Sequence, residues 1–418
     1  VTATLVNAIE PKKSIDPATL LFQSALRVTA RQGEFLPYPQ PDSPVALGRE
    51  EAEVRHLYRE SPPFARGHGA AAMWDASQAR CTQVWADFLP SCEVRSATFE
   101  IRASTPLDPR YRDLDFLAFH PDSAEIQRVL GGLVEAFEAW VSEEEASARS
   151  VGAEAGIAMA MRCREWCRRM REGVAALSDD TTFTAFQLAN KAMLWQMQMA
   201  EAGRDGPYTP AEARSAPELA SGSGYKWRPF QVAFFLGAIK SLVDEKATER
   251  EVVDVIWFPT GGGKTEAYLL VAAFELLRRR LVSGGIDPGT AVMSRYTLRM
   301  LTTQQFQRTG MLACSLELLR RASPETLGLR PFTVGLWVGQ SLTPNKFHNA
   351  EELLEQWDLG NPEAKNPFLV DRCPACATTL VDNANRSAGV TCSASSFKFH
   401  CLSASCQFHA QLPMQVVD

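Results

Sequence analysis

Residues 252–265 read VVDVIWFPTGGGKT, and this stretch decides the fold that we predict. The first six residues are mostly β-branched and apolar, which is typical of a buried parallel strand. A glycine-rich turn follows at once, and apolar side chains from Ala267 to Leu277 then recur at helical spacing. A strand, a glycine loop and a helix in this order predict a phosphate-binding loop.

Such a loop would hold a triphosphate at the N-terminus of the helix, where backbone N–H groups and the helix dipole favour negative charge. We expect Lys264 to reach the β- and γ-phosphates of ATP and Thr265 to offer its hydroxyl to Mg²⁺. A glycine turn that binds no nucleotide is the alternative interpretation. The predicted nucleotide-binding residues are Arg228, Gln231, Thr260, Gly261, Gly262, Gly263, Lys264, Thr265 and Glu266, and Lys264 and Thr265 are also the predicted catalytic residues.

Two further segments fit a helicase motor around this loop. Trp227-Arg228-Pro229-Phe230-Gln231 opens a helix upstream, and Gln231 is placed to read the adenine edge, as in the Q motif of superfamily 2 helicases. Downstream, an apolar strand at 291–293 leads into Arg295-Tyr296-Thr297-Leu298-Arg299, which resembles helicase motif Ia. We therefore predict that Arg295, Thr297 and Arg299 contact the phosphate backbone of DNA.

Half of the ten cysteines fall in one short stretch near the end of the sequence. Cys373-Pro374-Ala375-Cys376 forms one paired loop, and Cys401 with Cys406 closes a second. Two paired loops of thiolates suit a tetrahedral, structural zinc ribbon over 373–406, so these four cysteines are the predicted Zn²⁺ ligands. The competing ligands are Cys392, His400 and His409, and free cytosolic thiols are the alternative to a metal site.

Composition excludes some classes of protein. The chain has 418 residues, of which 45% are hydrophobic, so it is long enough for two or three folded domains. It contains no apolar run long enough to span a membrane and no signal-peptide pattern, which predicts a cytoplasmic location and no membrane partner. A net charge of −6 argues against general attraction to nucleic acid, although Lys and Arg outnumber Asp and Glu over 221–330.

Apolar residues at spacings of three and four predict three helices within 122–200. The second, over about 153–177, carries an arginine face that either lies against phosphates or pairs with neighbouring glutamates. The members of this face are Arg162, Arg164, Arg168, Arg169 and Arg171.

The motor motifs together resemble the DrmA helicases of DISARM anti-phage systems. The segments Gly67-His68-Gly69 and Ala185-Phe186-Gln187-Leu188-Ala189-Asn190-Lys191-Ala192-Met193 also fit that family, so the resemblance spans most of the chain. It implies a superfamily 2 DNA helicase or translocase with ATP and Mg²⁺ as its cofactors. It also implies DNA and a DrmB-like subunit as partners, with a methyltransferase or nuclease of the same system as a further candidate.

The chain departs from the family pattern because it contains no evident Walker B pair, second lobe or arginine finger. We therefore expect this chain alone to bind ATP weakly and hydrolyse little. A strand at Val416-Val417 leading to a Walker B Asp418 is a minor alternative. The alternative functions are a nucleic-acid-binding scaffold with a vestigial phosphate loop and an RNA helicase.

The predicted fold class is α/β: an incomplete RecA-like P-loop lobe with a mixed and helical N-terminal region and a zinc-ribbon insertion. The expected segments are a mixed region over 1–121, a helical subdomain and linker over 122–215, the first RecA-like lobe over 216–345, the insertion over 346–412 and a return strand over 413–418.

Overall fold

The computed structural model describes residues 3–8, 17, 24–38, 48–68, 70–75, 80–86, 89, 98–101, 106–258, 261–286, 289–296, 300–339 and 342–416, with only the backbone of 300–303. The chain divides into two compact units, Val1–Thr98 with Val141–Cys163, and Phe99–Trp140 with Arg164–Asp418. The long helices α3 (Ser123–Ser150) and α4 (Glu154–Ala176) contribute residues to both units.

The first unit contains a small antiparallel sheet and one short helix. The sheet has the order β1-β3-β2, built from β1 (Leu26–Thr29), β3 (Gln83–Ala86) and β2 (Ala72–Trp74), and the helix is α1 (Arg49–Leu57). In the same unit, Arg162 of α4 forms an ion pair with Glu53 of α1 at 3.0 Å. Part of the predicted arginine face is therefore already neutralised within this unit.

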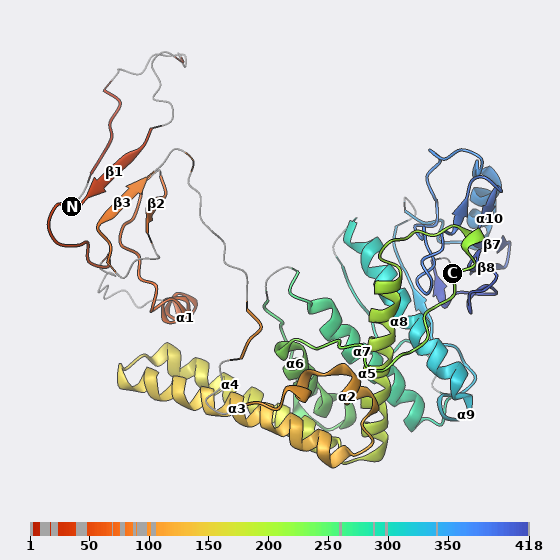
Figure 1. The fold of residues 1–418 in the computed structure, drawn as a ribbon, viewed down its shortest axis with the longest axis horizontal. Coiled ribbons are helices and arrows are strands. Elements are labelled where there is room, and N and C mark those ends of the chain that lie inside the picture. The colour runs from red at the N-terminus through yellow and green to blue at the C-terminus, as the bar shows by residue number, and fades with distance from the viewer. Residues whose placement is uncertain are drawn as a thin grey trace. The chain divides into compact units, whose positions relative to one another are not determined.

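The second unit is mostly helical (Figure 1). Its helices other than α3 and α4 are α2 (Leu114–Phe119), α5 (Asp180–Ala202), α6 (Pro229–Val243), α7 (Lys264–Val282), α8 (Met300–Ala322), α9 (Pro324–Leu327) and α10 (Phe347–Gln356). The three helices predicted within 122–200 are thus confirmed as α3, α4 and α5. The Asp179 carboxylate begins α5 by accepting a hydrogen bond from the Thr182 amide at 2.8 Å.

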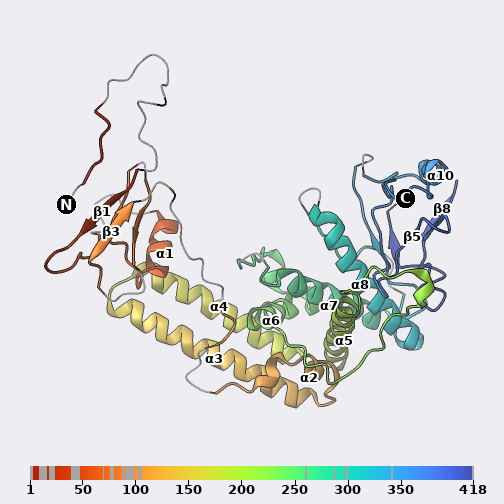
Figure 2. The ribbon, with the colours of Figure 1, turned by 45° about the horizontal axis from the view of Figure 1, so that its top comes forward.

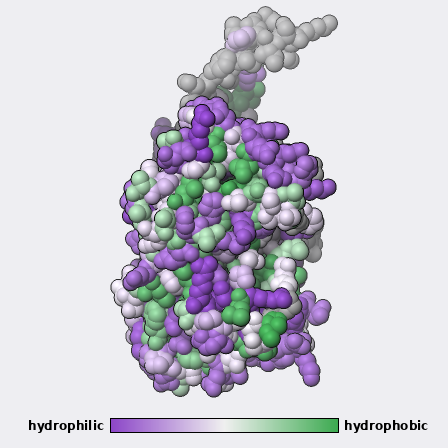
Figure 3. Space-filling model, turned by 90° about the vertical axis from the view of Figure 1, so that its right-hand side faces the viewer, coloured by the Kyte–Doolittle hydropathy of each residue, from purple (hydrophilic) through white to green (hydrophobic). Residues whose placement is uncertain are grey.

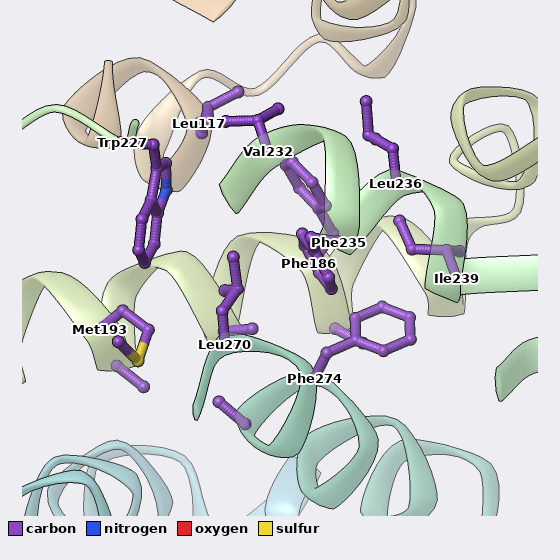
Figure 4. Close-up of a cluster of buried hydrophobic side chains, with 14 of the residues drawn as sticks. Leu117, Phe186, Met193, Trp227, Val232, Phe235, Leu236, Ile239, Leu270 and Phe274 are labelled. Atoms are coloured by element: carbon purple, nitrogen blue, oxygen red, sulfur yellow. The ribbon is translucent and has the colours of Figure 1, made fainter. Parts of the chain in front are cut away.

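Helix α5 is central to this unit because it packs against α2, α7 and α8 (Figure 2). The rings of Phe186, Phe235 and Phe274 meet between α5, α6 and α7, with centroids 5.6 and 5.5 Å apart (Figure 4). Trp227 is buried beside them and donates its indole N–H to Asn190 at 2.9 Å. Burial of each such side chain contributes about 2 kcal/mol or more, so this core fixes the three helices relative to one another.

Short strands dominate the C-terminal part of this unit. Two antiparallel pairs join β5 (Val381–Asp382) to β6 (Ser387–Ala388) and β7 (Val390–Ser393) to β8 (Ser396–Phe399). A parallel pair joins β4 (Val334–Gly335) to β9 (Met414–Gln415). Phe368, Phe397 and Phe399 form the centre of a second core here. Figure 3 views the molecule from this end, where hydrophilic residues surround scattered hydrophobic ones.

The buried strand predicted over 252–257 is wrong, because this segment forms no strand in the structure. Val253, Val255 and Trp257 are 87%, 81% and 94% exposed. The strand predicted at 291–293 is likewise absent, and Met293 is 81% exposed. A parallel strand depends on backbone hydrogen bonds to at least one neighbouring strand. Neither segment pairs with another strand in the described part of the chain, so the structure is a mixed, mostly helical α/β fold that shows no RecA-like sheet among the described residues.

No helix in the described part of the chain is both long enough and apolar enough to cross a lipid bilayer.

Candidate functional site

The glycine loop connects the extended segment 252–258 to α7. Gly261 and Gly263 have φ angles of 77° and 82°, in the left-handed region that glycine adopts without steric cost. A Cβ atom at Gly263 would lie 2.8 Å from Gln231 Nε2, so no larger residue fits there without displacing it. Helix α7 begins at Lys264, so the N–H groups of its first turn lie beside the loop. The predicted Thr260 lies outside the described residues.

Lys264 and Thr265 both have partners close to the loop. Lys264 Nζ donates a hydrogen bond to the carbonyl oxygen of Phe258 over 2.5 Å, which holds the ammonium group across the loop. The Tyr268 hydroxyl, one turn along α7, donates to Thr265 Oγ1 over 3.1 Å. The two side chains that would contact phosphate and Mg²⁺ are therefore adjacent at the start of one helix.

Gln231 and Arg228 contact the loop through hydrogen bonds to its backbone. Gln231 Nε2 donates to the Gly263 carbonyl at 2.7 Å, and its Oε1 accepts from the Arg228 amide at 2.7 Å. Arg228 Nη1 lies 3.3 Å from the Gly261 carbonyl. Both ends of the Gln231 amide are thus engaged in joining α6 to the loop, whereas the sequence predicted a residue that reads adenine.

An aromatic stack that the sequence did not reveal flanks the loop. Phe258 stacks on Phe230 with ring centroids 4.2 Å apart and on Phe99 at 5.6 Å. The guanidinium of Arg228 lies 4.0 Å from the centre of the Phe99 ring. Phe99 belongs to a segment without a recognisable motif, so only the three-dimensional contact identifies it.

The predicted motif Ia is linked to the loop by a pair of tyrosines. The Tyr296 hydroxyl donates to the Tyr268 hydroxyl at 3.1 Å, and Tyr268 in turn donates to Thr265. Burial is the main cause of the raised pKa of Tyr296, which keeps this hydroxyl protonated at neutral pH. Arg295 is exposed beside Tyr296, whereas Thr297 and Arg299 lie outside the described residues. Hydroxyl groups therefore form a continuous line from the motif Ia segment to the start of α7.

An ion pair between a buried arginine and Asp254 holds the segment that enters the loop. Arg169 of α4 donates from both terminal nitrogens to the two oxygens of Asp254, each over 2.7 Å. Its Nε also donates to the Gly237 carbonyl at 3.1 Å, and the Arg169 side chain is only 5% exposed. Since Asp254 lies four residues before Phe258, α4 and α6 together hold the otherwise exposed segment in place.

Two further arginines of the predicted basic face are also paired. Arg168 bonds to Glu165, Glu172 and Glu249, and Arg171 bonds to Glu138. The hydrogen bond from Arg168 is the main cause of the lowered pKa of Glu249. Four of the five arginines of this face are therefore in ion pairs, which favours the second interpretation given by the sequence over phosphate binding.

Glu266, the last residue of the predicted nucleotide set, lies in the first turn of α7. Its Oε1 is 3.2 Å from Arg308 Nη1 of α8. This ion pair joins the helix after the glycine loop to the helix after motif Ia.

The four cysteines predicted as metal ligands come together in the fold. The Sγ atoms of Cys373, Cys376, Cys401 and Cys406 all lie within 4.8 Å of one another, and the four residues are buried. The distance between Cys373 and Cys406 sulfurs is 3.9 Å, and that between Cys376 and Cys401 is 3.5 Å. Four sulfurs bound to zinc at about 2.3 Å lie about 3.8 Å apart, so the cluster could bind a metal such as zinc.

The competing candidate ligands, Cys392, His400 and His409, are not part of the four-sulfur group. His409 Nδ1 contacts the carbonyl oxygen of Cys401 at 2.8 Å, and His400 Nδ1 lies 3.4 Å from the Thr391 hydroxyl. Cys392 is outside the four-sulfur group, and burial raises the pKa of its thiol to about 11. Within the four-sulfur group, burial also raises the pKa of Cys373, whereas hydrogen bonds from the neighbouring thiols lower the pKa of Cys376.

Comparison with known proteins places this geometry in context. No family model matches the chain. The chain is 32% identical over 390 residues to "DISARM protein DrmA" of Bacillus paralicheniformis, a match that covers 87% of this chain. The match spans only 33% of the length of that relative. On this evidence the chain is DrmA-like over most of its length.

Proposed function

We propose that this chain is the ATP-binding and DNA-contacting part of a superfamily 2 helicase or translocase subunit that acts in DISARM anti-phage defence. The observation that carries the proposal is the glycine loop, with two glycines at positive φ, Lys264 at the first position of α7 and Gln231 bonded to the loop backbone. An anionic polyphosphate suits such a loop because the N-terminus of α7 and the Lys264 side chain both favour negative charge there.

The residues of this loop have separate roles in the proposal. Lys264 exchanges its carbonyl partner for phosphate oxygens, and Thr265 offers its hydroxyl to Mg²⁺. Bound Mg·ATP supplies the cleavable phosphate bond, and the loop amides hold the phosphates in position for it. Gln231 and Arg228 fix the loop backbone from α6, and Glu266 joins α7 to α8.

DNA contact is assigned to the motif Ia segment, through Arg295, Thr297 and Arg299. The hydroxyl line from Tyr296 through Tyr268 to Thr265 supports this assignment, because it offers a route by which DNA contact alters the loop. The proposal assigns no Walker B pair or second lobe to this chain, which spans 33% of the length of the DrmA relative.

The proposed partners and the metal follow from the family and from the cysteine cluster. We assign a structural Zn²⁺ to Cys373, Cys376, Cys401 and Cys406. The proposed partners are DNA and a DrmB-like subunit, with a methyltransferase or nuclease of the same system as a further candidate, in the cytoplasm. In this proposal 216–345 is the first motor lobe, 346–412 the insertion and 413–418 the return to the lobe.

The direct test is ATP hydrolysis by the intact protein in the presence of DNA. Lys264→Ala is expected to abolish hydrolysis and to leave the melting temperature within about 2 °C of the wild type. Lys240→Ala is the matched control, because Lys240 is a partly exposed lysine of α6 paired with Asp244. Undiminished hydrolysis by Lys264→Ala would refute the motor function and leave a nucleic-acid-binding scaffold.

A further inference from the structure

A cavity of about 770 Å³ lies between α5, α8 and the segment that carries the first two cysteines. It is separate from the glycine loop, although Glu266 forms part of its wall. A volume of this size is typical of a pocket for a small molecule or a nucleotide. The residues that decide its chemistry are Gln196, Arg204, Arg308 and Arg372, with Met197 and Leu369 as apolar surfaces.

Gln196 is the feature that points to a ligand. Its side chain belongs to α5, is 4% exposed and lines the cavity. Its Oε1 has no hydrogen-bond partner among the described residues. An unpaired buried amide costs about 1–3 kcal/mol, and native proteins usually satisfy such groups with protein, water or ligand atoms.

Three arginines and three carboxylates line the cavity, and the arginines differ in how many of their hydrogen-bond donors are already in use. Each carboxylate of the lining is already engaged, since Glu266 pairs with Arg308, Asp371 accepts from Asn366 at 3.0 Å and Glu201 accepts from the Tyr225 hydroxyl. In contrast, the Arg204 side chain makes no hydrogen bond or ion pair within the described part of the chain. Arg372 uses one nitrogen, which lies 3.4 Å from the Gly203 carbonyl.

We infer that this cavity is a binding site for a nucleotide. Arg204 and Arg372 bind its phosphate, the Gln196 amide bonds to an edge of its base, and Met197 and Leu369 contact the base faces. Guanidinium groups suit phosphate oxygens, and a glutamine amide matches a base edge with one donor and one acceptor. The site goes beyond the proposed function and rests on it only in expecting a DNA strand as one source of the nucleotide.

Two probes distinguish the sources of the nucleotide in equilibrium titrations of the intact, zinc-loaded protein. The first is thymidine monophosphate, which lacks the β- and γ-phosphates that the glycine loop would hold. The second is a fluorescent oligothymidylate strand. Both titrations are made in the Lys264→Ala background, so that the glycine loop contributes little to either.

Arg204→Ala is expected to weaken binding of at least one probe by about tenfold, and Gln196→Met by about threefold to tenfold. Gln196→Met should leave the melting temperature unchanged or raise it, because it removes an unpaired buried amide. Arg330→Ala, an exposed arginine outside the cavity, is the control and should bind as the parent protein does.

Weakened binding of the monophosphate assigns the site to free nucleotides, and weakened binding of the strand alone assigns it to DNA. If Arg204→Ala and Gln196→Met bind both probes as tightly as Arg330→Ala, the cavity holds only water and the inference is overturned. Loss of ATP hydrolysis in Lys264→Ala is measured separately, so failure here is distinguishable from failure of the motor proposal.

Discussion

The cysteine ribbon, residues 373–406, and the segment 252–258 that enters the glycine loop are held in place in opposite ways. The ribbon brings four buried sulfurs together from one short stretch and supports them with its own β-hairpins. The entering segment is extended, exposes Val253, Val255 and Trp257, and depends on Arg169 of a distant helix. A motif that closes on its own residues is stable locally, whereas a parallel strand depends on partners elsewhere.

The largest loss of stability is expected when a zinc ligand is removed from the ribbon. Cys376→Ser removes one of four sulfurs, and structural zinc contributes on the order of 10 kcal/mol of binding free energy to small metal domains. We expect loss of bound zinc, measured by elemental analysis, and rapid amide exchange over 373–406. Cys392→Ser is the control and should keep both zinc and protection. A Cys376→Ser variant with full zinc content would refute the four-cysteine site.

The next largest loss of stability is expected from breaking the Arg169–Asp254 ion pair, which holds the segment 252–258. Asp254→Asn leaves the buried Arg169 without its anionic partner and should lower the free energy of unfolding by about 3 kcal/mol. Combining it with Arg169→Met should recover part of this loss, because no unpaired charge is then buried. Denaturant titrations of the single and double variants measure both quantities. An unchanged midpoint for Asp254→Asn would show that the segment is held by other contacts.

A smaller change, in the stimulation of ATP hydrolysis by DNA, is expected from the hydroxyl line of Tyr296, Tyr268 and Thr265. Tyr268→Phe removes one hydroxyl and both hydrogen bonds that it makes, to Thr265 and Tyr296. The stimulation of ATP hydrolysis by DNA should fall about fivefold, because one hydrogen bond contributes roughly 1 kcal/mol. Hydrolysis without DNA should change little. Tyr208→Phe is the matched control, because its hydroxyl donates to the Ala202 carbonyl at 3.1 Å and is not part of the hydroxyl line. Equal stimulation in both variants would exclude this route.

The smallest loss of stability is expected at the N-terminus of α5. This helix packs against α7 and contributes Met199 to the core of the ribbon region. Asp179→Ala removes the N-terminal cap and should cost about 1 kcal/mol at neutral pH. The hydrogen bond from the Thr182 amide is the main cause of the lowered pKa of Asp179. A lowered folded-state pKa gives stability that is complete above about pH 4 and is lost as the pH falls through the folded value.

The difference in stability between wild type and Asp179→Ala should therefore shrink when melting is followed from neutral pH to about pH 3. A constant difference over that range would mean that the cap acts equally in its protonated form.

Helices and the cysteine group were predictable because their determinants are local. Apolar spacing located α3, α4 and α5, and two cysteine pairs marked the sulfur cluster. The predicted strand at 252–257 failed because its β-branched residues specify a strand only when neighbouring strands are present. Phe99 and the Arg169–Asp254 pair had no sequence signal, since both join residues far apart in the chain.

The central claim is that the glycine loop binds a triphosphate, and equilibrium binding of Mg·ATP to the intact protein measures it most directly. We predict saturable binding by the wild type that Lys264→Ala weakens at least tenfold, about 1.4 kcal/mol. Equal affinity of the two proteins, or no binding by the wild type in its complete assembly, would contradict the claim.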